Sequence, residues 1–243
     1  MMKLKVIGIL FLTMMLTACL YPDDQKVDHQ PTNDEQLEEV QQAVHQYKEQ
    51  NNGLLPIKNR DQDTPVYIKY PIDFNMLKEA NIMGQPPANS YERGGAYSYV
   101  IVDPEGEAAV KVSDVRVNQQ LRSINYDINL YRNKNLYPPY GDMIFKNYFE
   151  LDHDSLEEKE PLKVKSPYTR DELDVIINVD GQPLVDYRPD VYKLLEEQGI
   201  SEYDGDLRDL LVEEYPMVPS YSPPMVLEDG EIIFKEHETE TNE

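Results

Sequence analysis

The chain has few of the residues that usually carry out chemistry. It holds one cysteine and no tryptophan among 243 residues, so no disulfide can form within it. Its four histidines never stand at the spacing of metal ligands; they are His29, His45, His153 and His237. Glycine-rich phosphate loops and the Gly-x-Ser-x-Gly motif are also absent. We therefore expect no metal, no cofactor and no catalytic residue, and we favour a protein that is not an enzyme.

Basic residues are half as numerous as acidic ones. The chain has 23 lysines and arginines against 46 aspartates and glutamates, which gives a net charge of −23. A charge of this size and sign argues against nucleic-acid binding and against a chain that lies flat on anionic lipid. Two interpretations stay open: the charge keeps the protein soluble, or it attracts a cationic partner.

Only the amino-terminal end carries a long apolar run. Residues 6–16 are almost entirely apolar and follow Lys3 and Lys5. A bilayer span needs about 20 apolar residues, so this run is too short to cross a membrane comfortably. A positive start and a short apolar run are typical of a signal peptide. The run leads into Leu-Thr-Ala-Cys, in which the cysteine is Cys19.

The segment Leu16-Thr17-Ala18-Cys19 resembles the lipobox of bacterial lipoproteins. The resemblance implies that residues 1–18 are a signal peptide, that the Cys19 thiol takes a diacylglyceryl group, and that the new amino terminus is acylated. Several acyl chains anchor a protein stably, because each buried methylene contributes about 0.8 kcal/mol. We therefore expect a lipid-anchored protein on the extracytoplasmic face of the cell membrane. The alternatives for Cys19 are an uncleaved anchor helix or an ordinary buried cysteine.

A polar stretch and a helix follow the cysteine. The sequence LYPDDQKVDHQPTN has no apolar period and predicts a tether over residues 19–33. Thr32 and Glu35 have the spacing of a capping box, and apolar residues then recur every three or four positions. This pattern predicts a helix over 34–50. Removal of residues 1–18 would leave 21 basic residues against 46 acidic ones, a net charge of −25.

The body of the chain repeats one pattern. A first pass runs from the helix through LLPI, a strand VYIKY and an Asp-led helix DFNMLKEA to a hairpin YSYVIVDPEGEAAVKV. A second pass has a helix VNQQLRSINYDINLYRNKN, the loop LYPPYG, a strand and Asp-led helix KNYFELDHDSLEE, and a hairpin DELDVIINVDGQPLVDY. We predict an α+β fold of two tandem mixed α/β repeats with small, largely antiparallel sheets, over 34–116 and 117–235.

The carboxyl-terminal part extends the second repeat. DLRDLLVEEY predicts a helix, and MVLEDGEIIF predicts a strand-turn-strand with Asp229 and Gly230 at the bend. Residues 236–243 form a charged tail that we expect to be disordered. The acidic clusters LDHDSLEE and EYDGDLRD do not fit the twelve-residue calcium loop. We interpret their aspartates as helix caps and turn residues: Asp152, Asp154, Asp204 and Asp206.

Tyrosine and proline are the most unusual part of the composition, with 18 of each. Both residues offer rigid surface at low entropic cost, as recognition surfaces do. The turns that carry Tyr137, Tyr140 and Tyr221 are therefore our candidates for a partner surface. The alternative is that the tyrosines simply line the strands and loops of a small α+β protein.

The whole chain resembles the small lipoproteins of Bacillus-type Firmicutes, through its leader and its tyrosine- and acid-rich body. That resemblance implies a location and no activity. We expect a non-enzymatic binding or assembly module for an envelope protein or glycan. The alternatives are a solute-binding component of a transporter and a cell-wall enzyme without a recognisable motif. A parallel sheet with a deep cleft would favour solute binding, whereas shallow antiparallel sheets would favour the binding module.

Overall fold

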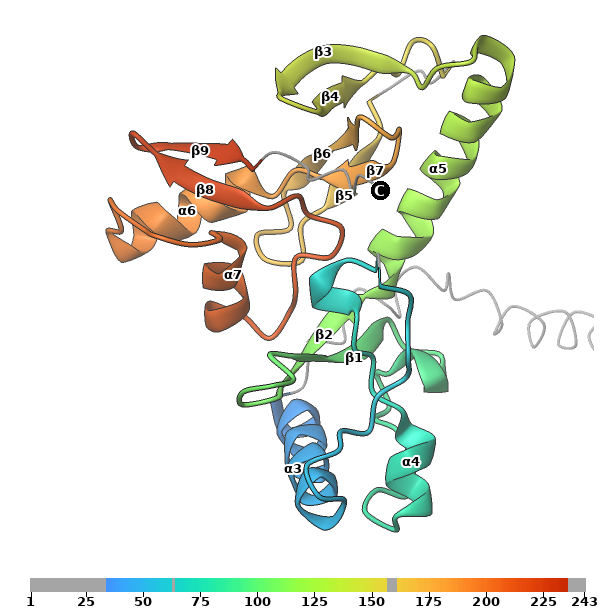
Figure 1. Ribbon diagram of the computed structural model, residues 1–243, viewed down its shortest axis with the longest axis vertical. Coiled ribbons are helices and arrows are strands. Elements are labelled where there is room, and N and C mark those ends of the chain that lie inside the picture. The colour runs from blue at the N-terminus through green and yellow to red at the C-terminus, as the bar shows by residue number, and fades with distance from the viewer. Residues whose placement is uncertain (1–33, 63, 157–160, 236–243) are drawn as a thin grey trace, which may run out of the picture. The chain divides into compact units, whose positions relative to one another are not determined.

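The computed structural model describes residues 34–62, 64–156 and 161–235. Within these ranges the chain forms five α-helices and nine strands, and every pair of named strands is antiparallel (Figure 1). The predicted α+β class with small antiparallel sheets is confirmed. The expected signal peptide, Cys19, the tether and the acidic tail lie outside the described residues. No helix in the described ranges is both long enough and apolar enough to span a bilayer.

The first half packs one helix on one hairpin. Helix α3 (Asp34–Gln50) has the predicted bounds and packs beside strand β2 (Ala109–Asp114), which pairs with β1 (Tyr97–Val102) over six residue pairs. Its buried side chains recur at helical spacing and enter the core of this half; they are Val40, Ala43, Val44 and Tyr47. The shorter helix α4 (Phe74–Glu79) lies near α3 in Figure 1. The sequence period therefore placed α3 correctly.

The segment VYIKY is not the strand that we predicted. Residues Val66–Ile68 form the 3-10 helix η2 instead. Its backbone bonds are local, since the Ile68 N–H donates to the Pro65 oxygen at 3.0 Å. Pro65 lacks an N–H and holds φ at −51°, and both Tyr67 and Ile68 are buried, whereas a half-buried strand alternates. Extended pairing begins only at Tyr70, whose oxygen accepts the Ile101 N–H at 2.8 Å.

The second half is built on a larger sheet. Helix α5 (Val115–Asn135) leads into strands β3 (Tyr140–Phe145), β4 (Tyr148–Leu151), β5 (Lys163–Lys165), β6 (Glu172–Asn178) and β7 (Pro183–Val185). The sheet order is β3-β4-β6-β5, and β7 also pairs with β6. Side chains from one stripe of α5 are buried in the same core as β6: Val117, Leu121, Ile124 and Ile128. The predicted helix is thus confirmed.

The last part of the chain that the structure describes forms two helices and a hairpin. These are α6 (Arg188–Gln198), α7 (Arg208–Glu214), β8 (Met225–Glu228) and β9 (Glu231–Phe234). Asp229 and Gly230 form the bend, both at positive φ, as the common two-residue hairpin turns require. The predicted strand-turn-strand is confirmed.

The second Asp-led helix is not present in residues 153–156, which form a turn. Asp152 still caps this turn, because its Oδ1 accepts the Ser155 N–H at 3.1 Å and its Oδ2 accepts the Ser155 hydroxyl at 2.5 Å. These bonds hold the pKa of Asp152 below its usual range. His153 Nδ1 accepts the Leu162 N–H at 3.2 Å. This bond holds the turn close to the start of β5.

Equivalent hydrogen bonds recur in the two halves. The Asp73 N–H donates to the Pro56 oxygen at 2.8 Å, and the Asp152 N–H donates to the Pro139 oxygen at 3.0 Å. The residues next to these bonds also correspond: Ile57 and Ile72 form an antiparallel β-bridge in the first half, and Tyr140 and Leu151 pair between β3 and β4 in the second. Each half then continues through a hairpin into a helix. This correspondence supports an internal duplication, whose exact boundaries stay a prediction.

Candidate functional site

Three helices of the chain begin with the same local structure, which we call the Asp-x-Arg bracket. It occurs at residues 114–116, 186–188 and 206–208, at the starts of α5, α6 and α7. In each bracket the aspartate accepts the backbone N–H of the arginine two residues on, and also binds its guanidinium through two oxygens. Asp114 is the N-cap residue of α5, whereas Asp186 and Asp206 stand one residue before the N-caps of α6 and α7. In all three brackets the aspartate holds the arginine in one conformation.

The three brackets differ in how deeply they are buried. The arginine side chains are 41% exposed for Arg116, 29% for Arg188 and 9% for Arg208. Arg208 donates a further bond to the Ser222 oxygen, at 2.7 Å, and its guanidinium carbon lies 5.0 Å from the centroid of the Tyr67 ring. Arg188 of the second bracket likewise lies 4.5 Å from the centroid of the Phe234 ring. The third bracket is the most buried of the three, and it links η2 to the segment after α7.

A cleft of about 890 Å³ opens beside this third bracket. Two parts of the chain form its wall: η2 with the β1–β2 hairpin, and α7 with the segment that leads into it. The lining residues are Val66, Tyr67, Tyr70, Val102, Asp103, Pro104, Glu107, Ala109, Lys111, Tyr203, Asp206, Arg208, Asp209, Val212 and Glu213. The segment after α7 runs beside β2, where the Val112 N–H donates to the Pro216 oxygen at 2.9 Å. The Ser113 and Ser220 hydroxyls are 2.7 Å apart at the same junction. These contacts hold α7 next to the first hairpin.

Tyr67 forms the best-defined contact in the cleft. Its hydroxyl donates to Asp209 Oδ1 at 2.6 Å, across 142 positions of sequence. Burial raises the pKa of Tyr67 far above its usual range, and the bond to Asp209 adds to this effect, while the charge of Arg208 opposes it. The phenol therefore stays protonated and acts as a donor, which leaves the second Asp209 oxygen available to a ligand.

Lys111 lies at the other side of the cleft. Its Nζ donates to the Tyr215 oxygen at 2.9 Å, and burial lowers its pKa, an effect that the charge of Glu213 partly offsets. Both basic groups in the cleft are thus already bonded within the protein. Five carboxylates also line the cleft: Asp103, Glu107, Asp206, Asp209 and Glu213. The excess of carboxylates over basic groups attracts cations, and the tyrosine rings can pack against apolar chain. The cleft therefore suits a ligand with cationic groups on an apolar stem.

The predicted partner tyrosines lie elsewhere and are not all brought together. Tyr137 is 55% exposed, and its ring packs edge-on against Tyr131 near the end of α5. The Tyr140 hydroxyl donates to the Val179 oxygen at 2.5 Å, and the Tyr221 hydroxyl donates to Asn118 Oδ1 at 2.8 Å near the start of α5. Thirteen helical residues separate positions 118 and 131, which is about 20 Å. Tyr137 and Tyr221 therefore belong to different surfaces.

The acidic clusters and the histidines form no metal site in the described part of the chain, where no group of three or more candidate ligands converges. His45 Nε2 lies 2.8 Å from Gln41 Nε2, and His153 is engaged by Leu162. Asp206 stands just before Leu207, the N-cap residue of α7, and accepts the Arg208 N–H at 3.1 Å. Asp154 and Asp204 are exposed.

Sequence reasoning missed the residues of the cleft, above all Tyr67, Lys111 and Arg208. One signal could have found part of it, since the triplets Asp-Val-Arg, Asp-Tyr-Arg and Asp-Leu-Arg each stand at the start of a helix, including α6, which the sequence analysis did not predict. The pairing of Tyr67 with Asp209 has no comparable signal.

The first half of the chain is similar to one known family. Residues 33–114 match the YphF family N-terminal domain. The match covers about a third of the 243 residues, from the start of α3 to the end of β2, and it stops at the aspartate of the first bracket. No curated protein and no solved structure matches the chain. The matched family carries no stated activity, so functional inference rests on the geometry of the cleft.

Proposed function

We propose that the protein is a lipid-anchored, extracytoplasmic binding module that holds a basic segment of an envelope protein. The observation that carries the proposal is the cleft, in which five carboxylates surround three tyrosines and both basic side chains are bonded within the protein. A lysine or arginine side chain of a partner would stack on tyrosine and pair with Asp209, Glu107 or Glu213.

The expected lipid anchor would hold this module at the extracytoplasmic face of the cell membrane. Cys19 would carry the lipid, and the tether over 19–33 would connect it to the domain that begins with α3. A chain held at the membrane meets envelope proteins at high effective concentration, so a modest affinity in the cleft suffices for function.

The transporter alternative finds less support in the fold. The named strands pair only antiparallel, in two hairpins and one sheet of five strands. Solute-binding components usually close two parallel-sheet lobes around a small molecule. The described residues that line the cleft include no serine, threonine, cysteine or histidine, so they offer carboxylates and phenols for binding rather than an activated hydroxyl or thiol nucleophile.

A double substitution of two exposed cleft carboxylates tests this role. Glu107→Gln with Glu213→Gln should weaken the binding of a fluorescent oligolysine peptide by roughly three- to tenfold at low salt, because two attractive charges are lost. Fluorescence anisotropy with the purified protein measures the dissociation constant. Added salt should weaken wild-type binding as well, since the contacts are solvent-exposed.

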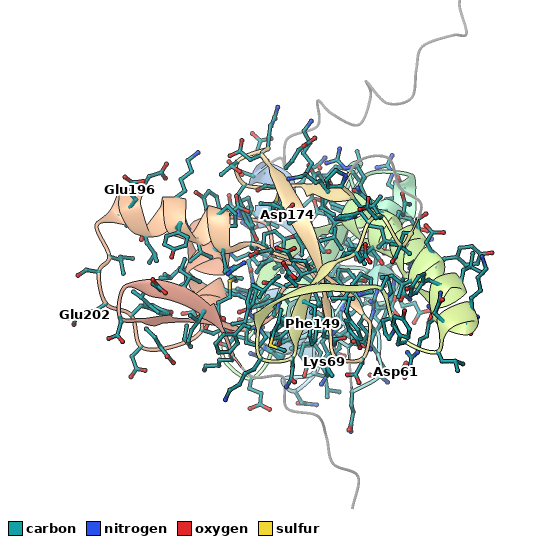
Figure 2. All side chains as sticks on the ribbon, turned by 90° about the horizontal axis from the view of Figure 1, so that it is seen from above. Asp61, Lys69, Phe149, Asp174, Glu196 and Glu202 are labelled. Carbon is teal, nitrogen blue, oxygen red and sulfur yellow. The ribbon has the colours of Figure 1, made fainter. Side chains whose placement is uncertain are left out.

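Glu196→Gln provides the matched control. Glu196 lies on α6, and Figure 2 shows it well separated from Lys69, the residue that follows η2 at the cleft. Removing its charge should leave peptide binding within about twofold of wild type. If Glu196→Gln weakens binding as much as Glu107→Gln or Glu213→Gln does singly, the peptide senses only net charge, and the cleft is not the site.

A further inference from the structure

A second cavity, of about 400 Å³, lies over the first half of α5. Sites for small ligands commonly have volumes of about 300–1,000 Å³, so this one is large enough for a compact molecule. Asn118, Arg122 and Asn125 reach it from one face of α5, because residues at these steps follow the helical period. Arg60 reaches it from the loop before η2 and Gln182 from the turn between β6 and β7.

The chemistry of this cavity is the opposite of that of the cleft. Arg60 and Arg122 have no hydrogen-bond or ion-pair partner among the residues that the structure describes, although the whole chain has twice as many acids as bases. Asp61 is the only carboxylate among the described lining residues, and Figure 2 shows it on the opposite side of the view from Glu196 and Glu202. Two guanidinium groups that no described carboxylate pairs with are an unusual concentration of positive charge in this protein.

The amide side chains of the cavity also present donors. Asn118 Oδ1 accepts the Tyr221 hydroxyl at 2.8 Å, and Gln182 Oε1 accepts Asn178 Nδ2 at 3.3 Å. Because these oxygens are engaged, the NH2 groups of Asn118 and Gln182 remain to donate to a ligand. Burial raises the pKa of Tyr221, whereas the charges of Arg122 and Arg60 lower it, so both guanidinium groups act on the same phenol. The guanidinium and amide donors therefore line the same cavity as Tyr221.

We infer that this cavity binds an anionic sugar or polyol unit, through Arg60 and Arg122 on its carboxylate or phosphate and through the amides on its hydroxyls. Arginine binds such oxyanions with two parallel hydrogen bonds, and amide groups suit hydroxyls. Pro65 and Pro183 give the cavity apolar wall for the C–H faces of the ligand, and Asp61 can accept a ligand hydroxyl. The inference is independent of the cleft, because the two cavities share no lining residue.

Titration calorimetry on the intact protein in detergent micelles tests the site, with N-acetylmuramic acid as the carboxylate probe and glycerol 3-phosphate as the phosphate probe. We expect at least one of them to bind, and the one that binds identifies the acidic group. Arg60→Ala and Arg122→Ala should each weaken that binding by about tenfold or more, because each removes a charge-assisted contact. Glucose, which is neutral, should bind much more weakly.

Arg132→Ala is the matched control, since it removes an arginine from the same helix about 15 Å further along. It should leave probe binding within about twofold of wild type. The inference is wrong if neither acidic probe binds, or if Arg132→Ala weakens binding as much as Arg122→Ala does. It is also wrong if inorganic phosphate binds as tightly as the better acidic probe, because the sugar or polyol part would then contribute nothing.

Discussion

Replacement of Arg208 by alanine is expected to lower the free energy of unfolding by about 3–5 kcal/mol. The Arg208 side chain is 9% exposed, and its loss would leave Asp206 without its cation and the Ser222 oxygen without its donor. Tyr67 would lose the cation that lies 5.0 Å from its ring centroid. A single change would therefore remove the contact that joins α7, the segment after it and η2.

Arg116→Ala is the internal control for this prediction. It breaks a bracket of the same geometry, with the same 2.6 Å contact between Nη2 and the aspartate, but its side chain is 41% exposed. Asp114 is 9% exposed and Asp206 is 20% exposed, so each variant leaves a carboxylate without its cation. Because water can reach Asp114 once the more exposed Arg116 side chain is removed, we expect a smaller loss of stability than for Arg208→Ala. Urea denaturation of both variants, with equal slopes, measures the difference. Equal losses for the two variants would show that burial of the third bracket does not matter.

Replacement of Cys19 by alanine is expected to abolish lipid labelling altogether and to move the protein out of the membrane fraction. The thiol is the only atom in the chain to which a diacylglyceryl group could be attached by thioether, since Cys19 is the one cysteine. No helix among the described residues is long and apolar enough to span a bilayer. Labelling of growing cells with a fatty-acid analogue, followed by fractionation, measures both effects.

Tyr21→Ala is a suitable control, because it changes the tether next to the lipobox and leaves the cysteine in place. This variant should be labelled and should stay with the membrane. Undiminished labelling of the Cys19→Ala protein would show that the lipobox interpretation is wrong. Loss of labelling without release from the membrane would place the anchor elsewhere in the chain.

Local sequence signals predicted the parts of the fold that depend on near neighbours. Helix α3 follows from a capping box and a three-to-four-residue apolar period, and the β8–β9 hairpin follows from Asp229-Gly230 between apolar runs. The prediction of a strand at 66–68 was wrong because it relied on the β-branched and aromatic residues of the segment. It gave too little weight to Pro65, whose fixed φ favours a tight turn. The prediction of a helix after Asp152 was wrong because the hydrogen bond between His153 and Leu162 holds residues 153–156 in a turn close to β5.

The candidate site depends on contacts that no local pattern contains. Tyr67 and Asp209 are 142 positions apart, and Lys111 and Tyr215 are 104 apart. Only packing of α7 beside the first hairpin brings them to one cleft. The tyrosine-rich turns drew attention to Tyr221, whose hydroxyl turns out to bind Asn118 beside the second cavity. Composition thus pointed to the residue type, and the tertiary structure determines which tyrosines meet.

The central claim is that the cleft contacts a protein partner in the envelope. A photo-crosslinking amino acid at Val66, which is 53% exposed and lines the cleft, tests this in intact cells. The same amino acid at Tyr126, which is 64% exposed on α5 and lines neither cavity, is the matched control. We predict a reproducible protein adduct from position 66 and none from position 126. No protein adduct from position 66, or the same adducts from both positions, would contradict the claim.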